Sequence, residues 1–247
     1  MAYNKKLALI ANITAIDVAF RIRNERTKAT ENEKQQLEAY TGFGGLKVIL
    51  NDENDLSGWS RTDLELLPAV QNLWNTVRRH ARDEREYNAI RSSLCSSVLT
   101  AFYTPDRFIS TLAKVLPDVL AKMPERVLEP SAGSGRFFQA FNGWSDRGEQ
   151  SITAYEKDIV TGTILQALHP DKQVHVDGFE TIPQEEMGTY DMAISNIPFG
   201  DFRVFDPLMK DGQRKLATQR IHNYFFVKGL DAVREGGGLS CTLPAGE

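Results

Sequence analysis

Three side chains of different chemistry follow a mostly apolar run at residues 191–195, which predicts a buried strand. The run leads into Asn196, Ile197, Pro198 and Phe199, just before a glycine. Asn196 offers an amide oxygen, Pro198 forces Ile197 toward extended geometry, and Phe199 offers a flat aromatic face. Such a set suits a planar group that carries an amine. A strand followed by an ordinary turn explains the same residues without any chemistry.

A second candidate site follows the apolar strand that we predict at residues 126–129. Glu129 ends this strand, and the loop after it contains Pro130, Ala132, Gly133 and Gly135, so its backbone can approach a ligand. The loop lacks both the Gly-x-Gly-x-x-Gly dinucleotide pattern and a P-loop lysine. A carboxylate at Glu129 would repel a pyrophosphate but attract an ammonium group. A ligand with a cationic head, such as the methionine part of S-adenosylmethionine, therefore fits better than NAD or ATP.

Two further acids close the next two predicted strands. Glu156 follows the strand at residues 151–155 and can accept hydrogen bonds from both hydroxyls of a ribose. Asp177 follows the strand at residues 173–176 and can accept from an adenine amino group while Phe179 packs on the ring. Each acid alone is more often a turn residue. Three acids at consecutive strand ends favour one shared ligand site.

These strands belong to a region, from residue 100 onward, in which strand and helix patterns alternate. The alternation predicts a parallel sheet covered on both faces. Phe102, Tyr103, Thr104 and Pro105 open the region, with Thr104 as the expected N-cap of a helix and Pro105 as its first residue. The free N–H groups of such a helix start suit a carboxylate or a phosphate, although capping alone explains the pattern.

The first 99 residues have helical patterns instead. Thr30 and Glu33 are spaced as a capping box, and the glycines of residues 41–45 permit a tight turn with Phe43 anchored in the core. A phosphate-binding loop is the alternative for that turn, but no strand precedes it. The mixed charges of residues 78–86 predict a salt-bridged helix face, with a DNA-binding patch as the alternative. We therefore expect a helical region at residues 1–99 and a catalytic domain at residues 100–247.

Composition limits the class of protein. The 247 residues are 41% hydrophobic and 25% charged, as in an ordinary globular chain. No apolar run approaches membrane-spanning length and no signal-like segment follows the first residues, so we expect a cytoplasmic protein. Two cysteines and four scattered histidines predict no structural metal. The net charge of −4 indicates that any DNA substrate is held only locally or by another segment.

The candidate residues, taken in order, resemble the motifs of S-adenosylmethionine-dependent N6-adenine DNA methyltransferases. The order matches the subgroup in which the cofactor motifs come first and the target-recognition region follows. The resemblance covers about residues 100–247. It implies a Rossmann-like methyltransferase sheet with helices on both faces, preceded by the helical region and truncated at its C-terminus. This family normally has Pro where this chain has Ile197, but the carbonyl needed there is present in both.

The resemblance also implies roles for the individual residues. Thr104 would meet the methionine carboxylate, and Glu129 the ammonium. Asn196 and the Ile197 carbonyl would accept hydrogen bonds from the target N6 amino group, and Phe199 would stack on the extruded base. The residues so assigned to the cofactor are Phe102, Tyr103, Thr104, Glu129, Pro130, Ala132, Gly133, Gly135, Glu156, Asp177 and Phe179, and those assigned to catalysis are Asn196, Ile197, Pro198 and Phe199.

Residues 40–46 and the Ile at position 197 are also similar to the methylase part of large phage, plasmid and conjugative-element proteins. Such proteins often continue into helicase-like regions, so a C-terminal target-recognition or helicase-like segment is an expected partner of this chain. Two other functions stay open. Release-factor methyltransferases use a similar turn on a protein glutamine, although the entry at residues 102–105 favours DNA. The other alternative is a scaffold that binds the cofactor but does not catalyse methyl transfer. The intact Glu129, Glu156, Asp177 and Asn196 count against it.

Overall fold

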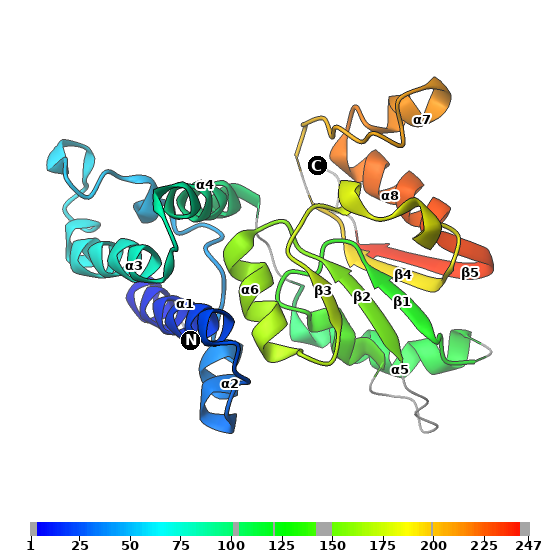
Figure 1. The fold of residues 1–247 in the computed structure, drawn as a ribbon, viewed down its shortest axis with the longest axis horizontal. Helices are drawn as coiled ribbons and strands as arrows, with labels where there is room; N and C mark the ends of the chain where they lie inside the picture. The colour runs from blue at the N-terminus through cyan, green and yellow to red at the C-terminus, as the bar shows by residue number, and fades with distance from the viewer. Residues whose placement is uncertain (1–3, 101–103, 121, 142–149, 199, 243–247) are drawn as a thin grey trace. The chain divides into compact units, whose positions relative to one another are not determined.

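The computed structural model describes residues 4–100, 104–120, 122–141, 150–198 and 200–242 (Figure 1). The chain divides into two compact units. The helical unit consists of Met1–Phe102 and Asp158–Pro170, and the sheet unit consists of Tyr103–Lys157 and Asp171–Glu247. In the described part of the chain, no helix is long and apolar enough to cross a membrane.

The sheet unit contains five strands, all paired in parallel, in the order β3-β2-β1-β4-β5. Their bounds are β1 Arg126–Glu129, β2 Ser151–Tyr155, β3 Gln173–His175, β4 Tyr190–Asn196 and β5 Val233–Thr242. The order reverses direction between β1 and β4, which is where doubly wound sheets bind their ligands. This topology confirms the predicted fold class, a parallel α/β sheet.

Helices cover both faces of this sheet. α8 (Ile221–Ala232) packs on β4 and β5, and α5 (Asp106–Val119) with the 3₁₀ helix η4 (Arg136–Phe141) lies on the other side of the sheet (Figure 1). The core under α8 combines aliphatic side chains from β1 and β4 with aromatic ones from α8. Its buried members are Leu128, Tyr155, Phe179, Ile182, Tyr190, Ala193, Ile197, Met209, Ala217, Ile221, Tyr224, Phe225 and Ala232.

Short elements complete the sheet unit. The 3₁₀ turns η5 (Phe179–Thr181) and η6 (Gln184–Glu186) precede β4, and the short helix α7 (Gly212–Ala217) precedes α8. β5 begins at Val233 and includes the glycine run at residues 236–238. Gly236 has a φ of 77°, and the pairing of β4 with β5 shifts register between Tyr190 and Met192. The glycines therefore form an irregularity inside the strand rather than a turn before it.

The helical unit consists of α1 (Lys5–Glu25), α2 (Glu31–Glu38), α3 (Leu67–His80) and α4 (Glu84–Thr100), together with α6 (Ile159–Leu168). The 3₁₀ turns η1 (Lys47–Leu50), η2 (Leu56–Gly58) and η3 (Leu64–Leu66) connect α2 to α3. α6 lies between β2 and β3 in sequence, but its contacts include α1, α2 and α4. The predicted capping box is present, because the Thr30 side chain accepts from the Glu33 N–H and the Glu33 carboxylate accepts from the Thr30 N–H.

The glycine turn between α2 and η1 is also as predicted. Gly42 and Gly45 have φ values of 75° and 77°, and Phe43 is fully buried. Asn12 of α1 holds this turn, since its Nδ2 donates to the Gly42 carbonyl at 2.6 Å and its Oδ1 accepts from the Thr41 N–H at 2.9 Å. Asn12 is itself fully buried. The turn is therefore part of the core of the helical unit.

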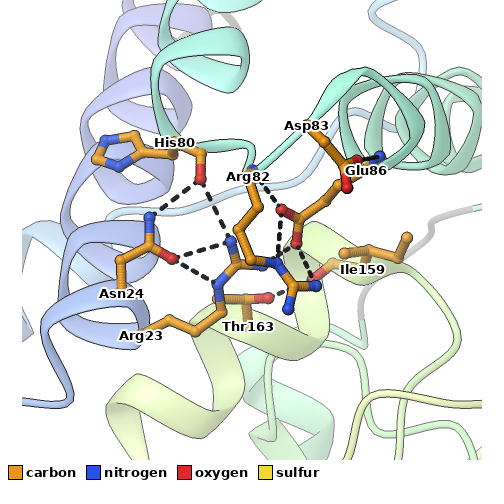
Figure 2. A network of polar contacts seen from close by, with 8 residues as sticks. All are labelled: Arg23, Asn24, His80, Arg82, Asp83, Glu86, Ile159 and Thr163. Carbon is orange, nitrogen blue, oxygen red and sulfur yellow. Dashed lines mark hydrogen bonds and ion pairs between the residues drawn. The ribbon is translucent and has the colours of Figure 1, made fainter.

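The charged run at residues 78–86 forms ion pairs, which confirms the salt-bridged interpretation. The run does not lie on one helix, because it spans the end of α3 and the start of α4. Arg78 pairs with Glu84. Arg82 and Arg23 both pair with Glu86 (Figure 2). Asn24 Nδ2 donates to the last carbonyl of α3, at His80. The network joins α1, α3 and α4.

One predicted helix start is wrong in detail. The sequence predicts Thr104 as the cap, but α5 begins at Asp106 and its N-cap is Pro105, in an extended conformation with φ −63° and ψ 143°. Among the described residues, no side chain caps this helix. The φ that proline imposes is compatible with both helical and extended backbone. Pro105 can therefore occupy the N-cap position as well as the first position of the helix.

Candidate active site

The central strand β1 and its two neighbours place three polar side chains at one edge of the sheet. Glu129 pairs in register with Ala154 of β2, and Leu128 pairs with Ala193 of β4. Ala154 of β2 is therefore level with Glu129, and Glu156 lies two positions after Ala154. By the same register Ile194 of β4 is level with Glu129, and Asn196 lies two positions after Ile194. Side chains alternate along a strand and register partners share a face. Glu129, Glu156 and Asn196 therefore lie on the same face at the carboxyl edge.

Glu129 is the most unusual of the three. Its side chain is fully buried, and neither carboxylate oxygen has a hydrogen-bond partner among the described residues. Burial raises the pKa of this carboxyl well above its usual value, and the nearby charge of Glu156 adds to the effect. A buried carboxylate without a partner is costly. A cation or a set of donors placed beside it would remove that cost.

Glu156 holds the loop that follows β1. Its Oε2 accepts from the Gly133 N–H at 2.7 Å, and its own N–H donates to the His175 carbonyl at 2.9 Å. Gly133 and Gly135 have φ values of 55° and 74°, a left-handed conformation that favours glycine. The Ala132 N–H donates to the Tyr155 carbonyl at 2.9 Å, so the loop lies over the ends of β1 and β2.

The turn after β4 is held by β5. Asn196 Oδ1 accepts from the Thr242 hydroxyl at 2.8 Å, and Thr242 is the register partner of Asn196. The Ile197 N–H donates to the Thr242 carbonyl at 3.3 Å, and the Ile197 side chain is 1% exposed in the core. A proline at position 197 could not make that bond. Pro198 is half-buried, and Phe199 lies outside the described residues.

The remaining predicted residues are placed less favourably for a ligand. Asp177 Oδ1 accepts from the N–H of Gly178, which is a local turn contact. The sequence predicts that Phe179 packs on a ligand ring, but it is a core residue, 1% exposed and packed against Tyr155 and Phe225 at ring distances of 6.1 and 5.6 Å.

Thr104 is buried, and its carbonyl accepts from Arg136 at 3.4 Å. Arg136 also pairs with Asp106 in the first turn of α5. Pro130 is buried at the start of the loop, and Phe102 and Tyr103 lie outside the described residues. In the part of the chain that the structure describes, no group of three His, Cys, Asp or Glu side chains could hold a metal ion.

Two residues at this edge are not predictable from local sequence. Thr242 orients Asn196 from a strand 46 positions later in the chain, and no local pattern marks it. Arg136 is simply the first residue after the small-residue loop. Its contacts with Thr104 and Asp106 depend on α5 lying beside η4, which only the fold provides.

The arrangement has a simple chemical meaning. The edge offers a carboxylate at Glu129 that no described residue compensates, a second carboxylate at Glu156 and an oriented amide at Asn196, with a glycine loop between the first two. Such a site suits an elongated ligand with a cationic group and hydroxyls, beside a second group that carries an amine.

Comparison with known proteins gives one sequence relative. The chain is 27% identical over 152 residues to the Defense against restriction protein B of Escherichia phage P1. The match covers 59% of this chain and 6% of the phage protein, so the chain spans a small part of the length of that relative. No protein-family model matches the chain.

Two of the solved structures with a similar arrangement are described as methyltransferases. A type I restriction-modification methyltransferase subunit from Streptococcus thermophilus has a TM-score of 0.48 at 10% identity, covering 94% of this chain and 67% of its own. A protein from Listeria monocytogenes described as a class I S-adenosylmethionine-dependent methyltransferase has a TM-score of 0.47 at 15% identity, covering 97% and 74%. With TM-scores below 0.5, these likenesses assign neither family nor chemistry to this chain.

Proposed function

We propose that residues 100–247 bind S-adenosylmethionine and transfer its methyl group to the N6 amino group of adenine in DNA. The observation that carries this proposal is the buried carboxylate of Glu129 at the centre of the carboxyl edge, which has no hydrogen-bond partner among the described residues. An ammonium group beside Glu129 would turn an unfavourable buried charge into an ion pair. The methionine part of S-adenosylmethionine carries such a group.

The neighbouring residues complete the cofactor assignment. In the proposal Glu156 accepts from the ribose hydroxyls while it holds the Gly133 N–H, since a carboxylate has lone pairs for several donors. Ala132 and Gly133 line the cofactor through their backbone, and Thr104 with the start of α5 meets the methionine carboxylate. Asp177 accepts from the adenine amino group. Phe179 keeps its packing role.

Asn196 and the Ile197 carbonyl perform the second half of the reaction. Both accept hydrogen bonds from the target amino group, which turns the nitrogen lone pair toward the methyl donor and stabilises the positive charge that develops on nitrogen. The Thr242 hydroxyl fixes the Asn196 amide for this task. When bound, S-adenosylmethionine supplies the methyl group on a sulfonium. Phe199 stacks on the extruded adenine.

The proposal also covers the DNA substrate and the protein segment that helps to hold it. The phage P1 relative is named for defence against restriction, which supports a DNA-directed role. The overall charge of −4 gives this chain little long-range attraction for DNA. We therefore assign part of the DNA grip to a target-recognition or helicase-like segment of a longer protein.

The deciding experiment separates cofactor binding from chemistry. In the Asn196→Ala variant of the full-length protein, we expect cofactor affinity within a factor of a few and methyl transfer lowered on the order of 10²-fold, because an acceptor aimed at developing charge is removed. Calorimetry measures the first quantity, and tritiated methyl incorporation into adenine-containing DNA measures the second.

The same assay with other possible substrates tests whether adenine in DNA is the methyl acceptor. DNA without adenine should accept no methyl group, and neither should a glutamine-containing release-factor peptide. Glu185→Ala is a suitable control, because Glu185 is exposed on η6 and should change neither quantity. Full adenine methylation by Asn196→Ala would mean that the turn at residues 196–199 is structural only.

A further inference from the structure

The loop after β4 presents an aromatic side chain to solvent between two anchored residues. Phe205 is 79% exposed. On one side of it the Val204 N–H donates to the Thr218 carbonyl at 2.9 Å. On the other side Asp206 is 3% exposed, contacts Lys228 Nζ and accepts from the Tyr224 hydroxyl at 2.8 Å. The backbone on both sides of Phe205 is therefore fixed.

The anchoring continues beyond Asp206. Its Oδ1 accepts from the Leu208 N–H at 2.7 Å, and Met209 is 4% exposed within the core under α8. Phe202 and Leu208, which flank Phe205 in the loop, are 43% and 44% exposed. Outward-facing apolar groups on a fixed loop indicate an interaction surface rather than a loose connection. The loop leaves the end of β4 and leads to α7 (Figure 1).

The segment that carries these aromatic side chains is also rich in exposed cations. Between residues 201 and 220 the exposed cations are Arg203, Lys210, Arg214, Lys215 and Arg220, and the exposed aspartates are at positions 201 and 211. Arg214 pairs with Asp231, and Arg220 pairs with Asp201. The third aspartate, Asp206, is buried and paired with Lys228. Among the described residues, no ion pair involves Arg203, Lys210 or Lys215. A local basic surface on a chain of net charge −4 favours a polyanionic ligand.

We propose that this surface, formed by Phe202, Phe205 and the exposed cations of residues 203–215, binds DNA with an unpaired base stacked on Phe205. Aromatic faces beside backbone-contacting cations are the combination that binds single-stranded nucleic acid. The inference rests on the proposed function and names a DNA contact for it. Phe205 follows Asn196 by nine residues, so the chain keeps it within about 30 Å of the proposed catalytic turn.

The test measures the affinity of the 247-residue chain for a labelled DNA single strand of about 15 nucleotides by fluorescence anisotropy. We expect Phe205→Ala to weaken binding about tenfold or more, because the stacking face is removed. Phe205→Trp should keep the affinity and Phe205→Leu should lose it. Val119→Ala is the matched control, since Val119 is apolar, 70% exposed and on α5.

A salt titration tests the cations separately. The double variant Lys210→Ala, Lys215→Ala should bind more weakly and reduce the slope of log K against log salt by about 0.7 for each phosphate that these lysines neutralise. Phe205→Ala should leave that slope unchanged, since it removes no charge. An unchanged slope in the lysine variant would contradict the assignment of these lysines to phosphates.

The remaining outcomes distinguish the alternatives. Wild-type affinity in Phe205→Ala, or no DNA binding by the wild-type chain, would overturn the inference. Wild-type affinity in Phe205→Leu would show a general apolar contact, as for a protein partner, and would also overturn it. Calorimetry with S-adenosylmethionine is run on the same variants. A wild-type chain that binds DNA through Phe205 but binds no cofactor would refute the proposed function and leave this inference standing.

Discussion

At the scale of single residues, Glu129 combines a cost in stability with a proposed role in binding. Its carboxylate is fully buried, and the described residues supply it with no donor. A chain selected only for stability would place an apolar residue at this position. Natural proteins carry such unfavourable groups at functional sites, where a ligand provides the missing partner.

The prediction for this residue concerns pH. The folded-state pKa of Glu129 lies above its ordinary value of 4.5, so the cofactor-free protein should lose stability as pH rises from 4.5 toward the raised pKa. Glu129→Gln removes this dependence. At neutral pH we expect the free energy of unfolding of the variant to exceed that of wild type by about 1–3 kcal/mol. The variant should therefore also unfold at a higher temperature. Thermal melts across pH measure the effect.

The same variant should no longer be stabilised by S-adenosylmethionine, because the ammonium loses its ion pair. Glu125→Gln is the control, since Glu125 is exposed just before β1 and should behave as wild type in both measurements. A lower melting temperature for Glu129→Gln at neutral pH would mean that the carboxylate already has a stabilising partner.

Ile197 gives a second prediction at this scale. Its N–H donates to the Thr242 carbonyl, a bond that proline cannot make. We expect Ile197→Pro to lower the free energy of unfolding by about 1–3 kcal/mol, because the variant lacks a buried bond and a core side chain. Methyl transfer should persist, since the carbonyl that we propose as the acceptor for the substrate amine is kept. Ile197→Val keeps the N–H and should change stability less. Loss of activity in a folded Ile197→Pro protein would contradict the carbonyl-only role.

At the scale of elements, the glycine loop after β1 depends on the end of β2. Glu156→Ala removes the acceptor of the Gly133 N–H and the proposed acceptor of the ribose hydroxyls. We expect cofactor affinity to fall by about 1–3 kcal/mol in binding free energy, measured by calorimetry. Glu156→Gln keeps an oxygen for the Gly133 N–H, so it should retain part of the affinity. Equal cofactor affinities for wild type, Glu156→Ala and Glu156→Gln would mean that Glu156 has only a structural role in its turn.

The elements also show how much of this fold can be predicted from sequence. The strand ends at Glu129 and Asn196, the capping box at Thr30 and the turn around Phe43 all follow from local patterns, and the structure confirms them. The features that local patterns do not predict depend on packing between distant segments. The ligand contact of Phe179 stays a prediction, and its burial against Tyr155 and Phe225 depends on how β2 and α8 pack.

At the scale of the whole molecule, α6 connects the two units. The chain leaves the sheet unit after Lys157 and returns at Asp171, and the helix between them belongs to the helical unit. Val160, Ile164 and Leu165 are fully buried. The helix start is fixed by α4, since Ser93 Oγ donates to Asp158 Oδ2 at 2.7 Å and accepts from the Ile159 N–H at 2.9 Å.

The last prediction follows from this connection. If α6 requires α1, α2 and α4 to bury its apolar side chains, residues 100–247 alone should not fold stably, because α6 would expose them to water. We expect the complete chain to unfold in one cooperative calorimetric transition, and the 100–247 fragment to show none and to be digested rapidly by protease. Ser93→Ala in the complete chain should lower stability by only about 1 kcal/mol, as expected when a helix-terminal hydrogen bond is removed. A fragment that melts cooperatively at the temperature of the complete chain would show that the sheet folds without the helical unit.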